Sequence, residues 1–314
     1  MEQEKTNART IETIMSDVDE NLLRMLEPET IRILEKVEKI TGLPIRVKWE
    51  SNNDLEYDNV GEIIGLVDVS GIDKDFHLVR CNPRFVGHIN HTLVHESMHI
   101  LRRWQAPFNK WKFLALPEQN LWTTIIGTKP QIKDELIELI KRGLLSPSES
   151  YNFFCNWVRD VLFTLACIPE DIRIEMSIWN NYGFIRKEQI KSLLVQIMDV
   201  SELYDEHYAH KLGCPPTLYS LKLAISSAYI IFACCTLGEI TLLKQSKGIK
   251  EFDMRRRLLV EGLDKKDRGF IGDCSDIDRW AKMLGIEGWF TWIIGKENIQ
   301  QILETKKGKE SLKR

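Results

Sequence analysis

Two histidines and a glutamate within one helical turn constrain the fold more than any other feature of the sequence. His95, Glu96 and His99 belong to a segment that fits the pattern His-Glu-x-x-His. On a helix, residues i and i+4 lie on one face, so both imidazoles can bind a single metal ion. Glu96 would lie beside that ion, where its carboxylate can accept a proton from water. The pattern therefore predicts a helix that carries a metal site.

The composition favours a soluble globular protein, with 43% hydrophobic and 28% charged residues. A net charge of −3 gives no electrostatic basis for binding nucleic acid or an anionic membrane, so neither is expected as a partner. The 7 cysteines are scattered without Cys-x-x-Cys pairs, which favours reduced thiols. The polar N-terminus does not resemble a signal peptide. We expect a cytoplasmic protein.

The longest uncharged run, Leu223 to Gly238, is shorter than the roughly 20 apolar residues that a membrane-spanning helix needs. It also contains two serines and a threonine. We therefore predict a buried core helix here.

Apolar spacing predicts an α+β fold. Two helices are expected between residues 8 and 40, with a break at Pro28. Strands are expected at Ile45–Trp49, in the apolar run Ile63–Val69, and at Phe76–Cys81, which should return antiparallel. The motif helix should follow and end near Trp104. The prediction is a small, largely antiparallel β-sheet next to this helix, followed by a mainly helical C-terminal part.

We divide the chain into two main parts. Residues 11–182 form the predicted catalytic domain, with an insertion near 107–150 whose clearest element is a helix between Pro130 and Gly143. Residues 183–304 form a helical C-terminal lobe packed on that domain. The charged segments 1–10 and 305–314 are expected to be disordered tails.

A catalytic zinc site usually has three protein ligands, so a third is needed. We expect a helix to begin at Pro169 after a break at Ile168, with Asp171 and Glu175 on its apolar face and Glu170 on the solvent side. Buried carboxylates are costly unless they are paired or bind a metal. Glu175 is the predicted ligand, with Asp171 accepting a hydrogen bond from a ligand histidine.

Two alternatives remain open for these carboxylates. Asp171 and Glu175 could exchange roles, so that Asp171 binds the metal. Both could instead be partly exposed or paired with the arginine run 255–257.

Five further residues are candidates for the surroundings of the site. His91, one turn before His95, is expected to line the pocket or cap the core rather than to bind the metal. Tyr182 lies at the end of the predicted acidic helix. His207, Tyr208 and His210 could stabilise an oxyanion, although a surface location is the simpler interpretation for each.

These residues resemble the zincin metallopeptidases, and among them the gluzincin type, in which His-Glu-x-x-His is joined by a glutamate on a later helix. The resemblance covers the strands from Ile45 to Cys81, the motif helix and the helix after Pro169. It implies a Zn²⁺ ion held by His95, His99 and Glu175, with Glu96 as general base. One departure is that Asp171 precedes Glu175, whereas in the gluzincin helix an acid follows the ligand.

The expected function is that of a zinc-dependent metallopeptidase, with a peptide or protein as substrate. One alternative is a catalytically silent zinc-containing interaction or regulatory protein, whose protein partner would bind the helical C-terminal lobe. Another is a non-peptidase zinc amidohydrolase. The last is a chance occurrence of the motif, with no metal at all.

Overall fold

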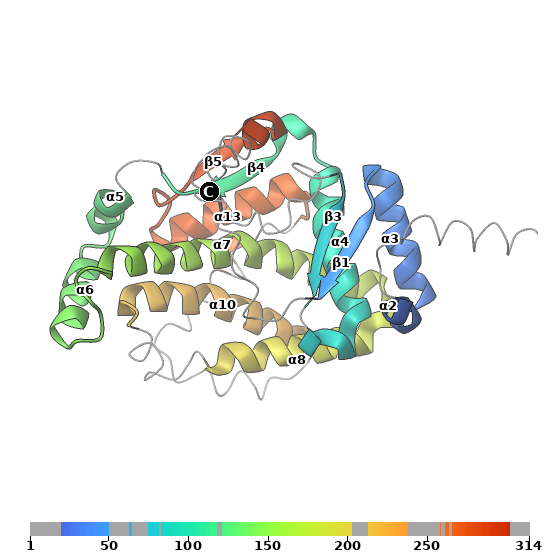
Figure 1. The fold of residues 1–314 in the computed structure, drawn as a ribbon, viewed down its shortest axis with the longest axis horizontal. Coiled ribbons are helices and arrows are strands. Elements are labelled where there is room, and N and C mark those ends of the chain that lie inside the picture. Colours follow the sequence, from blue (N-terminus) through green and yellow to red (C-terminus); the bar gives the residue numbers. More distant parts are fainter. Residues whose placement is uncertain are drawn as a thin grey trace, which may run out of the picture.

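The computed structural model describes residues 20–49, 63–64, 75–81, 83–117, 121–202, 213–237, 258, 261–263 and 266–301. Both predicted tails, together with His207, Tyr208 and His210, lie outside the described residues. The described part is mostly helical with small sheets, which agrees with the predicted α+β class (Figure 1).

The α-helices are α2 (Glu20–Met25), α3 (Pro28–Thr41), α4 (Ile89–Trp104), α5 (Leu121–Thr128), α6 (Gln131–Lys141), α7 (Ser150–Asn181), α8 (Arg186–Glu202), α10 (Pro216–Leu237) and α13 (Phe270–Leu284). Short 3-10 helices occur at Pro83–His88, Phe108–Lys110 and Gly183–Ile185. The strands are β1 (Ile45–Trp49), β2 (Ile63–Ile64), β3 (His77–Cys81), β4 (Lys112–Ala115) and β5 (Thr291–Ile294).

The first sheet pairs β1 with β3 in parallel, with Ile45 opposite His77 and Trp49 opposite Cys81. The sequence predicts that Phe76–Cys81 returns antiparallel after the run Ile63–Val69; most of that run lies outside the described residues, and in the described part β3 pairs in parallel with β1. A parallel pair needs a crossover of a dozen or more residues, and the long segment between the two strands meets that requirement.

A second sheet has the order β2-β4-β5 with antiparallel pairing. The sequence analysis did not identify β4 or β5, because each is a four-residue strand without clear alternation. Leu114 of β4 lies opposite Trp292 of β5. Since β4 belongs to the predicted insertion and β5 to the predicted C-terminal lobe, the two predicted parts share this sheet.

The motif helix is confirmed as α4, which a 3-10 turn precedes at Pro83–His88. Its inner face is apolar at Ile89 and Leu93, which are at most 2% exposed. These side chains pack in one cluster with Val79 of β3 and Val37 of α3. The other long face of α4, with the histidines, is directed at α7.

Helix α7 is continuous from Ser150 to Asn181 and contains Pro169. The predicted break at Ile168–Pro169 is therefore wrong. A proline inside a helix removes one hydrogen bond and costs about 3 kcal/mol. Leu165 and Ile172 on either side are both fully buried in the largest core cluster, and this packing holds the helix together across Pro169.

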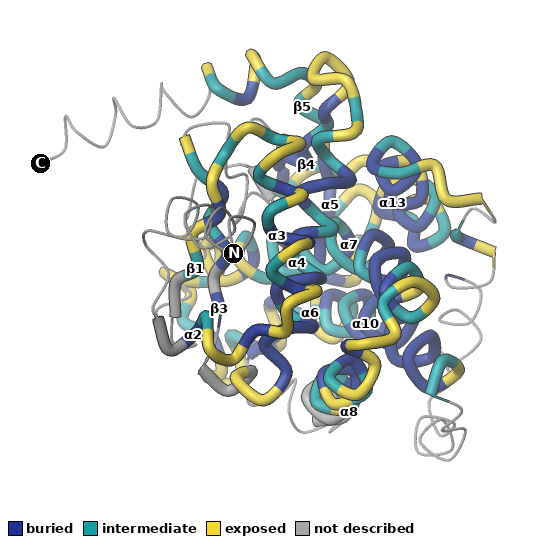
Figure 2. The backbone as a smooth tube through the Cα atoms, turned by 90° about the vertical axis from the view of Figure 1, so that its right-hand side faces the viewer, coloured by how far each residue is buried: buried dark blue, intermediate teal, exposed yellow. Residues whose placement is uncertain are grey.

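Helix α7 runs through the centre of the molecule, with α10 and α13 packed along it and α4 across its C-terminal half (Figure 1). Figure 2 shows long buried stretches in α10 and α13. Helix α10 is long and apolar enough to cross a membrane by length and composition, yet 72% of its most apolar 18-residue window is buried against other elements. Its burial agrees with the predicted core helix.

An ion pair between Arg173 of α7 and Asp276 of α13 joins these helices in the interior. The Arg173 Nη2 atom is 2.6 Å from the Asp276 carboxylate, and both side chains are at most 6% exposed. Asp276 also accepts a hydrogen bond from Arg279. Removal of one partner leaves a buried charge uncompensated.

We predict that Asp276→Ala lowers the free energy of unfolding by about 3–5 kcal/mol, because Arg173 then keeps a buried charge without its main acceptor. The matched control is Glu138→Ala, which breaks the Glu138–Arg142 pair, both of whose side chains are more than half exposed. That control should cost less than about 1 kcal/mol. Denaturant unfolding measures both, and equal losses would contradict the prediction.

Candidate metal centre

Helices α4 and α7 cross so that the imidazoles of one meet the carboxylates of the other. The two helices run in opposite directions at this contact. His91 and His95 of α4 contact Glu175 of α7. His95 and His99 contact Asp171, and His99 also contacts Glu170. The i,i+4 spacing on each helix produces this match, because it stacks side chains one turn apart on a single face.

Three atoms converge at the middle of this contact. The Nε2 atoms of His95 and His99 are 3.1 Å apart. Asp171 Oδ1 lies 3.1 Å from His99 Nε2 and 3.5 Å from His95 Nε2. Ligands bound at about 2.0–2.2 Å to one tetrahedral ion lie roughly 3.3–3.6 Å from one another. One of the three separations lies in this range and the other two, at 3.1 Å, are slightly shorter, so all three are close to the edges of a metal coordination sphere.

The opposite nitrogen of each histidine faces another carboxylate. His95 Nδ1 is 2.8 Å from Glu175 Oε1, and His99 Nδ1 is 3.2 Å from Glu170 Oε1. A carboxylate acceptor at Nδ1 favours the tautomer with a proton on Nδ1 and a lone pair on Nε2. Two lone pairs and a carboxylate oxygen then face one another, and such a set needs a cation or added protons between them.

In the absence of a metal, these surroundings favour protonated imidazoles. Burial would lower the pKa of His95, but hydrogen bonds to Asp171 and Glu175 outweigh it and raise the pKa to about 10. Burial acts in the same way on His99, and Glu170 and Asp171 raise its pKa well above the usual value. A divalent cation bound between these groups would take the place of such protons.

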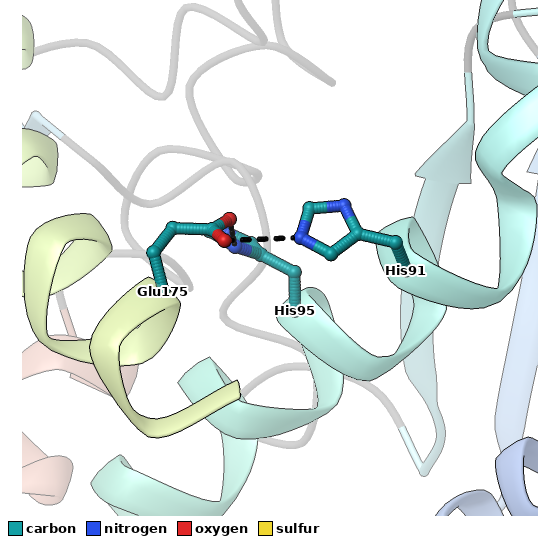
Figure 3. Close-up of side chains that lie close together, drawn as sticks. All are labelled: His91, His95 and Glu175. Atoms are coloured by element: carbon teal, nitrogen blue, oxygen red, sulfur yellow. Dashed lines mark hydrogen bonds and ion pairs between the residues drawn. The ribbon is translucent and has the colours of Figure 1, made fainter. Parts of the chain in front are cut away.

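Glu175 is fully buried, and its carboxylate faces both His91 and His95 (Figure 3). Its carboxylate lies between the rings of His91 and His95, 3.1 Å from His91 Nε2. Gln189 of α8 donates to the carboxylate at 2.6 Å and to the Glu175 carbonyl at 2.9 Å. Burial would raise the pKa of Glu175, yet the two histidines hold it well below its usual range.

Two sets of residues therefore have atoms close enough to hold one metal ion, and they share His95. One consists of His95, His99 and Asp171, and the other of His91, His95 and Glu175. The second set already forms hydrogen bonds of ordinary length, and Gln189 supplies a further donor. Because Glu175 faces the Nδ1 side of His95, it lies on the opposite side of that ring from His99. The structure therefore does not bring together the predicted set of His95, His99 and Glu175.

A cavity of about 340 Å³ opens on the first set. His95, His99 and Asp171 line it, as does Glu96, and all four are partly exposed. Glu96 forms no hydrogen bond or ion pair with any other described side chain. A carboxylate beside the convergent atoms, in contact with the cavity and without a partner in the described part of the chain, is suited to accept a proton.

Glu170 is a correction to the sequence analysis, which placed it on the solvent side of α7. It is only 7% exposed and lies next to His99 and Arg102. Glu170 lies where α4 and α13 both pack on α7, since it contacts His99 and Arg102 of α4 and Arg102 is bound by Asp273 of α13. A helical wheel of α7 alone cannot reveal this second neighbour.

Arg102 connects this side of the centre to α13. Its guanidinium donates to both oxygens of Asp273, at 2.6 and 2.9 Å, and to Asp267. The sequence analysis did not select Arg102, Gln189 or Asp273, because their partners come from helices more than 10 residues away in the chain. No local pattern could have identified them.

Two further predicted site residues within the described part of the chain, His91 and Tyr182, lie away from the cavity. His91 is 1% exposed behind His95, where it binds Glu175. Tyr182 packs against an apolar cluster that includes Val94 and Ile178. Neither side chain lines the cavity that Glu96 lines.

Comparison with known proteins adds no relative, since no protein-family model, curated protein or solved structure matches this chain.

We predict that Gln189→Ala lowers the free energy of unfolding by about 1–3 kcal/mol, because the buried carboxylate and the buried carbonyl of Glu175 each lose one donor. Gln196→Ala on the same helix is the matched control, since Gln196 is half-buried and bonds Ser192 at 3.2 Å. It should cost less than Gln189→Ala in denaturant unfolding. The reverse order would contradict the role given to Gln189.

Proposed function

We propose that the chain is a zinc-dependent hydrolase of peptide bonds, in which His95, His99 and Asp171 hold the metal ion. The observation that carries the proposal is the convergence of two imidazole nitrogens and one carboxylate oxygen within 3.5 Å of one another at a cavity. Two histidines, one carboxylate and an open position form the usual donor set of a catalytic zinc site.

This proposal exchanges the roles expected for the two carboxylates on α7. Asp171 would be the third ligand, and Glu175 would accept the Nδ1 hydrogen of His95. Glu170 would do the same for His99, so that each ligand histidine is oriented by its own carboxylate. Such partners fix the tautomer and the ring orientation of a metal-binding histidine. These contacts therefore favour Asp171 as the third metal ligand, the alternative left open by the sequence, over Glu175.

A zinc ion, when bound, would lower the pKa of a water molecule to about 7 and polarise a substrate carbonyl. Glu96 would accept the proton of that water and then donate it to the leaving amine. The position of Glu96, one residue after His95 and at the cavity, supports this role. Its lack of a partner among the described residues leaves the carboxylate available for both steps.

We predict that Asp171→Ala removes zinc from the purified protein, because one of three ligands is lost. Glu175→Gln should keep zinc but bind it about 10–100-fold more weakly, since only the orientation of His95 is disturbed. Asp160→Ala, at a partly exposed position of the same helix, is the control and should leave zinc binding unchanged. Metal analysis and chelator competition measure these effects.

The opposite pattern, with zinc lost from Glu175→Gln and kept in Asp171→Ala, would return the ligand role to Glu175. A wild-type protein that binds no zinc under conditions where it is folded would overturn the metal part of the proposal.

We predict that Glu96→Gln keeps zinc and loses peptide hydrolysis by at least about 100-fold, because general base catalysis contributes 10²–10⁴-fold. The measurement is cleavage of a peptide panel by the wild type and the variant, with zinc content as the internal control. Retained hydrolysis in the variant would contradict the role of Glu96. Zinc binding without hydrolysis of any panel member in the wild type would favour the silent interaction protein, and cleavage of small amides alone would favour an amidohydrolase.

A further inference from the structure

Two cations line the cavity beyond the convergent atoms. Arg103 follows His99 by one helical turn on α4, and Lys112 begins β4. Neither forms an ion pair with a described acid, and Arg103 Nε is buried without a hydrogen-bond partner. The acids nearby have other partners, because Glu170 lies against His99 and Asp273 is bound by Arg102. Glu96, Glu170, Asp171 and Asp273 line the same cavity, but neither cation is held in an ion pair by a described acid.

The two cations act on the same part of the cavity wall. Burial raises the pKa of the Cys274 thiol on α13 to about 12, and Lys112 and Arg103 both act in the opposite direction. Glu170 and Asp273 raise the same pKa, so the two cations and these two acids all lie near Cys274. A carboxylate placed between an arginine and a lysine gains charge-assisted hydrogen bonds, which are the stronger kind. An anionic group is the ligand that this part of the cavity fits.

Aromatic side chains surround the cations. The Arg103 guanidinium lies 5.3 Å from the Phe113 ring centre and 5.6 Å from that of Phe270, and Lys112 Nζ lies 5.6 Å from that of Trp292. Phe163 also lines the cavity. Cavities with mostly apolar walls and a few placed polar groups bind ligands that combine an apolar body with one polar anchor.

The cavity volume of about 340 Å³ is near the lower end of the 300–1,000 Å³ range of ligand sites. It has room for a small ligand rather than a long stretch of polypeptide. One helical turn separates His99 from Arg103 by about 6 Å along the helix axis. One extended residue spans about 3.5 Å. A single residue that begins at the convergent atoms therefore brings its carboxylate within reach of the Arg103 side chain.

We infer that this cavity binds the C-terminal residue of a peptide, with its free carboxylate on Arg103 and Lys112 and an apolar side chain among the aromatic rings. The inference rests on the proposed function and makes the protein a carboxypeptidase. Water adds across the last peptide bond: its oxygen joins the carbonyl carbon of the shortened peptide, and the released amine takes up a proton through Glu96. The products are a peptide with a new carboxyl end and one apolar amino acid.

The binding test uses the full-length Glu96→Gln variant, which cannot turn over its ligand. Acetyl-Ala-Phe with a free carboxylate should bind at least about tenfold more tightly than the same peptide with a C-terminal amide, as calorimetry measures it. Adding Arg103→Gln or Lys112→Gln should each weaken binding of the acid about tenfold and leave the amide unchanged. Lys110→Gln, an exposed lysine two residues before Lys112, is the matched control and should change neither.

The hydrolysis test uses the wild type and the same two peptides. The acid should be cleaved to acetyl-alanine and phenylalanine, and the amide should be cleaved at least about tenfold more slowly. Arg103→Gln and Lys112→Gln should raise the KM for the acid while leaving kcat within about threefold, since they bind the terminus and do not act on the reacting bond.

The outcomes separate this inference from the proposed function. Equal binding and equal cleavage of acid and amide would overturn the carboxylate site while the hydrolase remains. Selective binding of the acid without any cleavage would keep the carboxylate site and overturn the hydrolase. Unchanged binding in both Arg103→Gln and Lys112→Gln would overturn the assignment of the cations.

Discussion

The antiparallel contact between α4 and α7 is the interaction on which the rest of the structure depends. It places Glu170, Asp171 and Glu175 against His91, His95 and His99, one helical turn after another. An ion removed from water loses several kcal/mol of solvation, so carboxylates in this position are stable only with donors or cations beside them. The histidines and Arg102 of α4 and Gln189 of α8 supply those partners, and Asp273 of α13 in turn binds Arg102.

The same contact explains the geometry of the candidate centre. Outer carboxylates on both sides hold the Nδ1 atoms of His95 and His99, and this leaves both Nε2 atoms directed at Asp171. Elements distant in the chain then complete the cavity in front of these atoms. Helix α13 contributes Phe270 and Cys274, and the β4–β5 pair contributes Lys112 and Trp292. The candidate metal ligands thus lie on two helices, and the cavity beside them depends on the whole fold.

Local sequence patterns could predict the parts that depend on one helix. The spacing of His95 and His99 predicts their shared face, and the apolar stripe of the later helix predicts that Asp171 and Glu175 point inward. Contacts between elements could not be predicted in this way. The parallel pairing of β1 with β3, the burial of Glu170 where α4 and α13 pack on α7, and the continuity of α7 through Pro169 each depend on neighbours remote in sequence. The choice between Asp171 and Glu175 as the metal ligand also depends on contacts between elements, because it rests on which nitrogen of His95 each carboxylate faces.

The central claim is that one metal ion joins His95, His99 and Asp171. Crystals grown with zinc, measured on both sides of the zinc absorption edge, test this claim most directly. The account predicts one anomalous peak at about 2.0–2.2 Å from both Nε2 atoms and from an oxygen of Asp171, with Glu175 still on Nδ1 of His95. A peak coordinated by Glu175 and His91, or no peak between the two helices, would contradict it.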